Sequence, residues 1–259
     1  TWIGSGVPRF YLPLDQVFPQ TNVSQLIVVP QDLVTREKLR HELPTFMAQT
    51  FPEVRARVKL LPNGPPVPYP VQFRVSGPNP TVLRERADEV KRVMRDNPNT
   101  RGVNDNWNES VKSLKLDIDQ DKARALGVSS QSLAQATRTF WSGTTVGQFR
   151  EGDRLIDIVM RQPANERQAL ADLASVNVPT ASGRSIPLSQ IAKPVLAWEP
   201  GVLWRENRDY AITVQADIVD GLQGATVTHQ IWPALSTLQD QWRASGGTAY
   251  RIEIAGAVE

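Results

Sequence analysis

The 259-residue sequence contains no cysteine, which excludes disulfide bonds and cysteine-based zinc sites. Histidine is nearly absent, with His41 in the charged stretch REKLRHEL and His229 at an expected helix start. Both are interpreted as structural or solvated residues. Two isolated histidines do not predict a transition-metal site, and nothing signals a serine–histidine–aspartate arrangement. The sequence therefore predicts no catalytic residue, no metal site and no cofactor, and hence a protein that is not an enzyme.

A strong excess of one charge and long apolar runs are also missing. Lysine and arginine number 29 against 27 acidic residues, and no basic run alternates with aromatic residues, so nucleic-acid binding is not expected. No apolar run approaches the roughly 20 residues that cross a bilayer. No signal sequence opens the chain. The ends, TWIGSG and EIAGAVE, are interpreted as cuts within a longer protein.

The stretch SLKLDIDQDKARALGVSSQSLAQAT, residues 113–137, brings three carboxylates close together: Asp117, Asp119 and Asp121. Apolar and polar residues alternate over 114–119, which predicts a half-buried antiparallel strand. Gly127 is expected to end a short helix and Ser129 to cap the next one. A calcium loop needs a glycine and a trailing glutamate at fixed positions, and neither is present. The carboxylates are therefore interpreted as the solvated face of a strand and the start of a helix.

Two strand–helix–strand units are predicted, which makes the fold class α+β. The first has strands over 71–77 and 100–108, and its helix, capped by Asn79, has a buried stripe of Leu83, Ala87, Val90 and Met94. The second has strands over 211–218 and 250–254 and a helix over 225–242, with one apolar face: Val227, Ile231, Leu235, Leu238 and Trp242. Two such units normally pair into a ferredoxin-like split βαβ sandwich.

The 108–209 stretch between these units is predicted to be an inserted α+β domain, with a strand over 154–161 and a hairpin turn at Ser182–Gly183. Residues 1–22 show no sustained periodicity and are expected to form a loop. Strands are predicted over 24–30 and over 53–61, the latter with one basic face of Arg55, Arg57 and Lys59. The helix between them has an apolar face and an expected kink at Pro44: Leu39, Leu43, Phe46 and Met47.

Polar and aromatic side chains suggest a wide amphiphilic cleft. The residues that would line it are Arg57, Lys59, Asn104, Asn106, Thr213, Gln215, Phe10, Tyr11 and Phe18. Asn104 and Asn106 are expected at an exposed strand end. The alternative, which periodicity alone leaves open, is that these residues form solvated sheet edges.

Three motifs, in this order, carry a resemblance to a known family: LKLDIDQDKARALGVSSQSLA (114–134), GRSIPLSQIA (183–192) and PGVLWRENRDYAITVQADI (200–218). They resemble the resistance–nodulation–division (RND) drug exporters, specifically the second large periplasmic loop of the inner-membrane pump subunit in the hydrophobe/amphiphile efflux branch. The resemblance covers nearly the whole chain.

The resemblance implies a domain layout and a location. Residues 1–66 would be part of the first porter subdomain of the C-terminal half, and its first strand and helix are expected to precede Thr1. Residues 67–107 with 210–259 would be the second porter subdomain, and 108–209 the docking subdomain. The chain would lie in the periplasm as the soluble loop of an inner-membrane protein. The implied partners are amphiphilic small molecules, two further copies in a homotrimer, a periplasmic adaptor protein and an outer-membrane channel.

The resemblance also assigns residues. Substrate-binding positions would be Arg57, Lys59, Leu61, Val67, Asn104, Asn106, Thr213 and Gln215. A switch loop, matched by residues 4–19, would include Gly4, Ser5, Gly6, Phe10, Tyr11 and Phe18. The basic residues would favour anionic or polar amphiphiles. The alternative of another class is a free-standing periplasmic binding or assembly module with ferredoxin-like domains.

Overall fold

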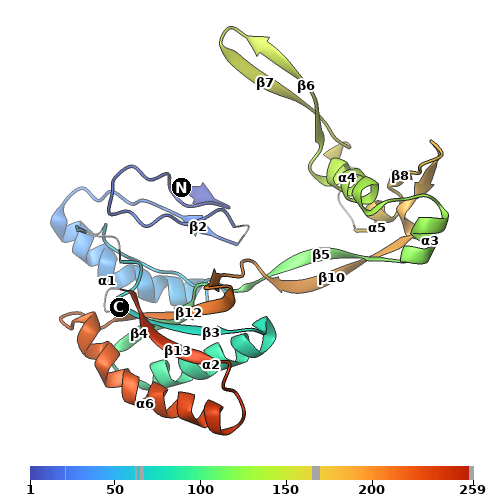
Figure 1. The fold of residues 1–259 in the computed structure, drawn as a ribbon. Coiled ribbons are helices and arrows are strands. Elements are labelled where there is room, and N and C mark those ends of the chain that lie inside the picture. The colour runs from blue at the N-terminus through green and yellow to red at the C-terminus, as the bar shows by residue number, and fades with distance from the viewer. Residues whose placement is uncertain (21, 62, 65–66, 165–169, 257–259) are drawn as a thin grey trace. The chain divides into compact units, whose positions relative to one another are not determined.

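The computed structural model describes residues 1–20, 22–61, 63–64, 67–164 and 170–256 (Figure 1). It divides into two compact units, Thr1–Val111 with Pro200–Glu259, and Lys112–Glu199. Helices and strands are mixed in both units, as the α+β prediction requires. The prolines Pro62, Pro65 and Pro66 lie outside the described residues. Within the described part of the chain, no helix combines the length and apolarity needed to cross a lipid bilayer.

The first unit is built on one antiparallel sheet with the order β13-β3-β12-β4. A short β11 pairs with the start of β12. The elements run β3 (Val71–Gly77), α2 (Pro80–Asp96), β4 (Thr100–Asp105), β11 (Arg205–Glu206), β12 (Asp209–Ile218), α6 (Gly224–Ala244) and β13 (Arg251–Ala255). Two strand–helix–strand units thus pair in one sheet, although β4 and β12 are far apart in the sequence.

The core of this unit lies between the sheet and the two helices, which cover the same face in Figure 1. The Asn79 side chain accepts hydrogen bonds from the Thr81 and Val82 backbone N–H groups, and so starts α2 as predicted. All four residues of the predicted α2 stripe are fully buried. The α6 face is confirmed as well, with Leu238 only partly buried. Alternate β3 residues, Val71, Phe73 and Val75, complete the core.

The N-terminal elements of the same unit differ from the prediction. The expected strand over 24–30 is limited to β2 (Ser24–Gln25), which pairs with β1 (Trp2–Ile3). Residues 53–61 form no strand, although they alternate in polarity. The apolar members of this segment stay at least one-third exposed because no core covers them. Arg55, Arg57 and Lys59 of this segment are held by side-chain contacts instead of a backbone ladder.

Helix α1 (Leu33–Thr50) is present where a helix was predicted, with Asp32 as its cap. Its expected apolar face is not buried in the first unit. Leu39, Leu43 and Met47 are half-buried, whereas Phe46 is 52% exposed. The helix continues through Pro44.

The second unit is connected through a two-stranded ribbon of β5 (Ser110–Ile118) and β10 (Ala192–Pro200), which lie side by side in Figure 1. Its other elements are α3 (Gln120–Ala125), α4 (Ser130–Trp141), β6 (Thr144–Glu151), β7 (Arg154–Met160), α5 (Leu170–Ala174), β8 (Asn177–Pro179), β9 (Ser185–Pro187) and the 3-10 turn η2 (Leu188–Gln190). The predicted hairpin is confirmed, because β8 pairs with β9 and Gly183 has a φ of 79° in the turn.

The acidic stretch spans the end of β5 and the start of α3, with Asp119 at the helix cap and not on the strand. Asp119 caps α3 by accepting the Lys122 backbone N–H, and this bond holds the pKa of the Asp119 carboxyl below its usual value. Ser129 caps α4 through a reciprocal pair of hydrogen bonds with Ser132. Among the residues that the structure describes, no group of three or more His, Cys, Asp or Glu side chains is placed to hold a metal ion.

Candidate functional site

The sheet of the first unit has a polar face opposite its core. The register places Gln72 beside Gln215 and Arg74 beside Thr213, and all four side chains are half-buried. Because side chains alternate along a strand, these residues point away from the core that Phe73 and Val214 enter. Thr213 and Gln215 therefore lie on one face, as their spacing predicted.

The two asparagines of the candidate site join this face through hydrogen bonds. Gln215 Nε2 donates to Asn104 Oδ1 at 3.0 Å. Asn104 is only 6% exposed, so its expected position at an exposed strand end is wrong. Its amide is engaged at both ends, because Nδ2 donates to the Gly102 carbonyl at 2.7 Å while Oδ1 accepts from Gln215. Asn106 Oδ1 accepts the Thr213 backbone N–H at 2.9 Å. These amides thus extend the β4–β12 pairing.

Arg57 lies over the Asp217 end of this polar face. Its Nε and Nη2 donate to the two carboxylate oxygens of Asp217 at 2.7 and 2.6 Å. Nη2 also donates to the Pro68 carbonyl at 2.7 Å. The guanidinium lies 3.7 Å from the centre of the Tyr69 ring. Bidentate pairing with stacking is the strongest way that arginine is held at a surface.

The neighbouring cations of the extended segment, Arg55 and Lys59, are also paired with carboxylates, each through a single contact. Lys59 Nζ donates to Asp15 Oδ2 and to the Val67 carbonyl, both at 3.1 Å. Arg55 donates to Asn108 Oδ1 at 2.7 Å and lies 3.2 Å from a Glu109 carboxylate oxygen. We call residues 55–59 the ion-pair strap. Its three alternate cations each hold a carboxylate from a different part of the chain, so the expected basic lining is largely neutralised.

The N-terminal loop, residues 4–19, is closed by backbone contacts. Gly4 N donates to Val23 O at 2.8 Å, and Gly6 N donates to Val17 O at 3.3 Å. Val7 N donates to Gln25 Oε1 at 2.8 Å. Ser5, between the two glycines, is half-buried.

The aromatic residues of this loop lie near its surface. Phe10 and Phe18 are 58% and 56% exposed. The Phe10 and Tyr11 ring centres are 5.4 Å apart. Phe18 contacts Trp204, with ring centres 5.9 Å apart, and Trp204 Nε1 donates to Asn106 O. The loop therefore presents aromatic surface next to the end of the polar sheet face.

The predicted residues are brought together in part. The strap links the loop, through Lys59, to the sheet, through Arg57. Val67 contributes its carbonyl and Leu61 is 52% exposed beyond the strap. Sequence reasoning missed the residues that hold these side chains in place: Asp15, Tyr69, Trp204 and Asp217. Asp217 continues the alternation of Thr213 and Gln215, so the strand period could have indicated it.

Gly6 fixes how closely the two arms of the N-terminal loop approach. A Cβ atom at this position would lie 2.7 Å from both the Cβ and the carbonyl oxygen of Val17. Gly6→Ala is expected to separate the arms and to speed trypsin cleavage after Arg9 severalfold, because a loosened loop fits a protease better. Mass spectrometry of the fragments measures this rate. Gly147→Ala on β6, where the nearest atom to an added Cβ is Ile158 Cδ1 at 4.0 Å, should leave it unchanged.

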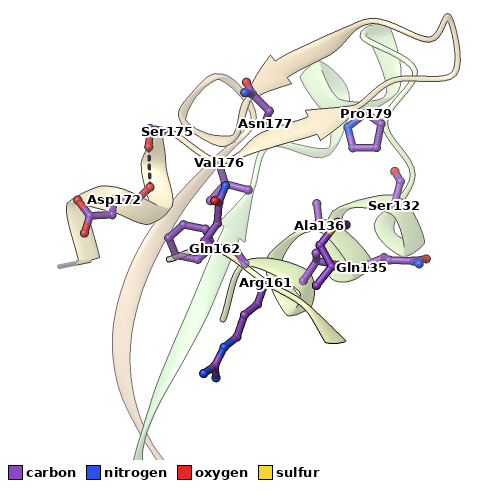
Figure 2. A pocket seen from close by; sticks show the side chains of 13 residues that line it. Ser132, Gln135, Ala136, Arg161, Gln162, Asp172, Ser175, Val176, Asn177 and Pro179 are labelled. Carbon is purple, nitrogen blue, oxygen red and sulfur yellow. Dashed lines mark hydrogen bonds between the residues drawn. The ribbon is translucent and has the colours of Figure 1, made fainter. Parts of the chain in front are cut away.

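The second unit contains a hollow of about 820 Å³, which shares no residue with the predicted site. Figure 2 shows Ser132, Gln135 and Ala136 of α4 on one side and Val176 and Asn177 on the other. Ser175 Oγ donates to the Asp172 carbonyl at its edge. Since the strap and the N-terminal loop join several predicted residues in the first unit, we take that region as the candidate site.

The comparisons with known proteins cover most of the chain. Residues 36–256 match the AcrB/AcrD/AcrF family. The cobalt-zinc-cadmium resistance protein CzcA of Cupriavidus metallidurans is 27% identical over 197 residues, which cover 71% of this chain and 18% of that protein. The multidrug export protein AcrF of Escherichia coli is 29% identical over 119 residues, 46% of this chain and 12% of that protein. The chain thus spans less than one-fifth of the length of these relatives.

Solved structures show a similar fold. The crystal structure of a heavy metal efflux pump matches with a TM-score of 0.58 and 20% identity, over 65% of this chain and 18% of that one. A second crystal form matches with a TM-score of 0.57 over 74% of this chain and 20% of that one.

Proposed function

Because this chain belongs to the AcrB/AcrD/AcrF family, we propose that it is the porter and docking portion of an RND exporter of the hydrophobe/amphiphile branch. The relatives of the chain are named for multidrug export in one case and for cobalt-zinc-cadmium resistance in another. In this proposal the chain binds amphiphilic compounds during proton-driven export and changes no covalent bond in them. It is therefore a transport module and not an enzyme.

The sheet topology supports the assignment of a porter subdomain. The order β13-β3-β12-β4, with the helices α2 and α6 on one face, fits a ferredoxin-like split βαβ fold and supports this proposal. We assign residues 67–107 and 210–259 to the second porter subdomain and residues 1–66 to part of the first. The inserted residues 108–209 would then be the docking subdomain, in contact with an outer-membrane channel. An adaptor protein and two further copies in a periplasmic trimer complete the proposed assembly.

One observation carries the amphiphile proposal: the ion-pair strap joins an exposed aromatic loop to a polar sheet face within one unit. Aromatic surface with a few placed polar groups binds varied amphiphiles, because apolar contact needs little directionality. The N-terminal loop would act as the switch loop beside this surface. Its closed arms and exposed rings suit that role.

Export of a divalent cation is the second candidate, favoured by the names of CzcA and of the efflux-pump structures. Such a cation prefers carboxylate or imidazole ligands. The carboxylates of the candidate site, Asp15 and Asp217, are each already paired with a cation. This pairing favours amphiphiles over divalent cations at this site.

A fluorescence titration tests the amphiphile proposal. The purified chain is expected to bind the neutral probe N-phenyl-1-naphthylamine at micromolar concentration. A variant with Phe10, Tyr11 and Phe18 changed to alanine should bind it at least about fivefold more weakly, because each ring that the probe covers contributes apolar contact. A matched control removes three exposed apolar side chains of the β6–β7 hairpin, Phe149, Ile156 and Ile158, and should keep the affinity.

The outcomes separate the two candidates. Equal weakening in both variants would show that the probe binds any apolar surface, and the amphiphile site would be misplaced. Saturable zinc or cobalt binding by calorimetry, lost on Asp15→Asn with Asp217→Asn and without binding of the probe, would support cation export instead.

A further inference from the structure

The cations of the ion-pair strap differ in how fully they are engaged. Arg57 donates hydrogen bonds to both carboxylate oxygens of Asp217 and to the Pro68 carbonyl, and its guanidinium group lies over the Tyr69 ring. Lys59 Nζ donates to Asp15 and to the Val67 carbonyl. An ammonium has three N–H groups. The contacts of Lys59 within the described residues therefore leave it one donor for a further acceptor.

The Lys59–Asp15 pair is open enough to exchange partners. The two side chains are 33% and 26% exposed, and one monodentate contact at 3.1 Å joins them. A partly exposed ion pair is weak because water and salt compete with both charges. An incoming carboxylate or sulfonate makes the same charge-assisted hydrogen bond that Asp15 makes. Such a group can therefore replace Asp15 as the partner of Lys59. Neither the Lys59 ammonium nor the displaced Asp15 carboxylate is then left buried without a partner.

The position of Asp15 links this exchange to the N-terminal loop. Asp15 lies on the loop beside the buried Leu14, and the same loop presents Phe10 and Leu12, which are 58% and 78% exposed. Lys59 lies on the strap, which Arg57 ties to the sheet. The Lys59–Asp15 pair is thus a link between the loop and the strap. A ligand that carries an acidic group on an apolar body is complementary to this site, because the Lys59 cation lies next to the apolar side chains of the N-terminal loop.

We propose that Lys59 receives the acidic head group of an anionic amphiphile, which displaces the Asp15 carboxylate and releases the N-terminal loop from the strap. The proposal rests on the proposed amphiphile-binding function and names the ligand class at that site. Ligand uptake and loop release are then one event, since the ligand and Asp15 compete for one ammonium.

The test compares an anionic and a neutral probe of similar shape, 1-anilinonaphthalene-8-sulfonate and N-phenyl-1-naphthylamine. Asp15→Asn removes the competing charge and should tighten binding of the sulfonate by up to about fivefold, the upper end of the range for a partly exposed ion pair. Lys59→Gln should weaken it by a similar factor. Neither variant should change the affinity for the neutral probe. Asp240→Asn, which breaks the exposed Arg243–Asp240 pair on α6, alters the net charge equally and is the control.

Loop release has its own measurement. In the unmodified chain, the sulfonate should speed trypsin cleavage after Arg9, and the neutral probe should not. In Asp15→Asn cleavage should be fast already and insensitive to either probe. A role of the ion pair in stability alone would not make the cleavage rate depend on the anionic probe.

Three outcomes overturn the inference. The first is an affinity for the sulfonate that stays unchanged in Asp15→Asn and in Lys59→Gln. The second is a gain in sulfonate affinity in Asp240→Asn as large as the gain in Asp15→Asn. Both leave the amphiphile proposal standing if the neutral probe binds the loop. The third is failure of the neutral probe to bind the unmodified chain, which overturns the proposed function and this inference with it.

Discussion

Asp105→Ala is expected to lower the free energy of unfolding of the first unit by about 3–5 kcal/mol, the usual cost of removing one partner from a buried ion pair. The Asp105 side chain is 3% exposed at the end of β4. Its Oδ2 lies 2.9 Å from Arg84 Nη1 and 2.5 Å from Lys91 Nζ, and its Oδ1 accepts the Trp107 backbone N–H. Alanine would leave the Lys91 side chain, which is 12% exposed, with the exposed Asp88 carboxylate but without the buried one.

Urea unfolding followed by circular dichroism measures this change. The matched control is Asp240→Ala, because the Arg243–Asp240 pair has the same chemistry but is more than half exposed. That variant should lose at most about 1 kcal/mol. Asp105→Asn should fall between the two, since an amide oxygen still accepts the Trp107 N–H. Equal losses in the Asp105→Ala and Asp240→Ala variants would show that the buried pair contributes no more than a surface one.

Phe73→Ala is expected to lower the free energy of unfolding by about 3–5 kcal/mol through the lost apolar burial and the cavity left behind. Phe73 is fully buried in the middle of β3, and the neighbouring strands β12 and β13 limit how far the site can collapse. Its ring stacks on Trp232 with ring centres 6.3 Å apart. Urea unfolding should therefore show a lower midpoint with an unchanged denaturant dependence.

The control for this variant is Phe46→Ala on α1, which deletes the same atoms from a side chain that is 52% exposed. Its effect should stay near about 0.5 kcal/mol, as for other surface substitutions. A loss of several kcal/mol in Phe46→Ala would mean that α1 buries this ring in solution, contrary to the structure. A small loss in Phe73→Ala would mean that the core refills the cavity.

The first unit shows which parts of a fold can be predicted from sequence. The helix α2 could be predicted because the spacing of its apolar residues and the Asn79 cap are local, and tertiary contacts agree with both. The segment 53–61 could not, because alternating polarity is the same whether the backbone joins a sheet or the side chains make ion pairs. A strand also needs a free sheet edge, and the sequence does not show one.

The sequence indicated residues of the candidate site, but it did not indicate the acidic residues that pair with them. Aromatic residues in a loop and cations at alternate positions are visible in the sequence. Their carboxylates are not, because Asp217 lies 160 positions from Arg57 and Asp15 lies 44 positions from Lys59. Charge at a site depends on which acids the fold brings to it. The basic residues were therefore predicted without the acids that pair with them, Asp217 at Arg57 and Asp15 at Lys59. Their assignment as a substrate lining stays a prediction.

The ribbon of β5 and β10 has a consequence for how quickly the sheet forms. Strand β12 must find β3 and β4 across the inserted unit, and such distant pairing normally slows folding. Cross-strand contacts close the ribbon, since Ser113 Oγ and Lys115 Nζ both reach the Glu199 carboxylate. Once β5 and β10 have paired, the segments that lead from the ribbon to β4 and to β12 are held close together. This holds whatever the length of the segment inserted beyond the ribbon. The entropic cost of closing the long loop between β4 and β12 is then met when the ribbon forms, before the sheet closes. We therefore expect the rate of sheet closure to depend little on the length of the inserted segment.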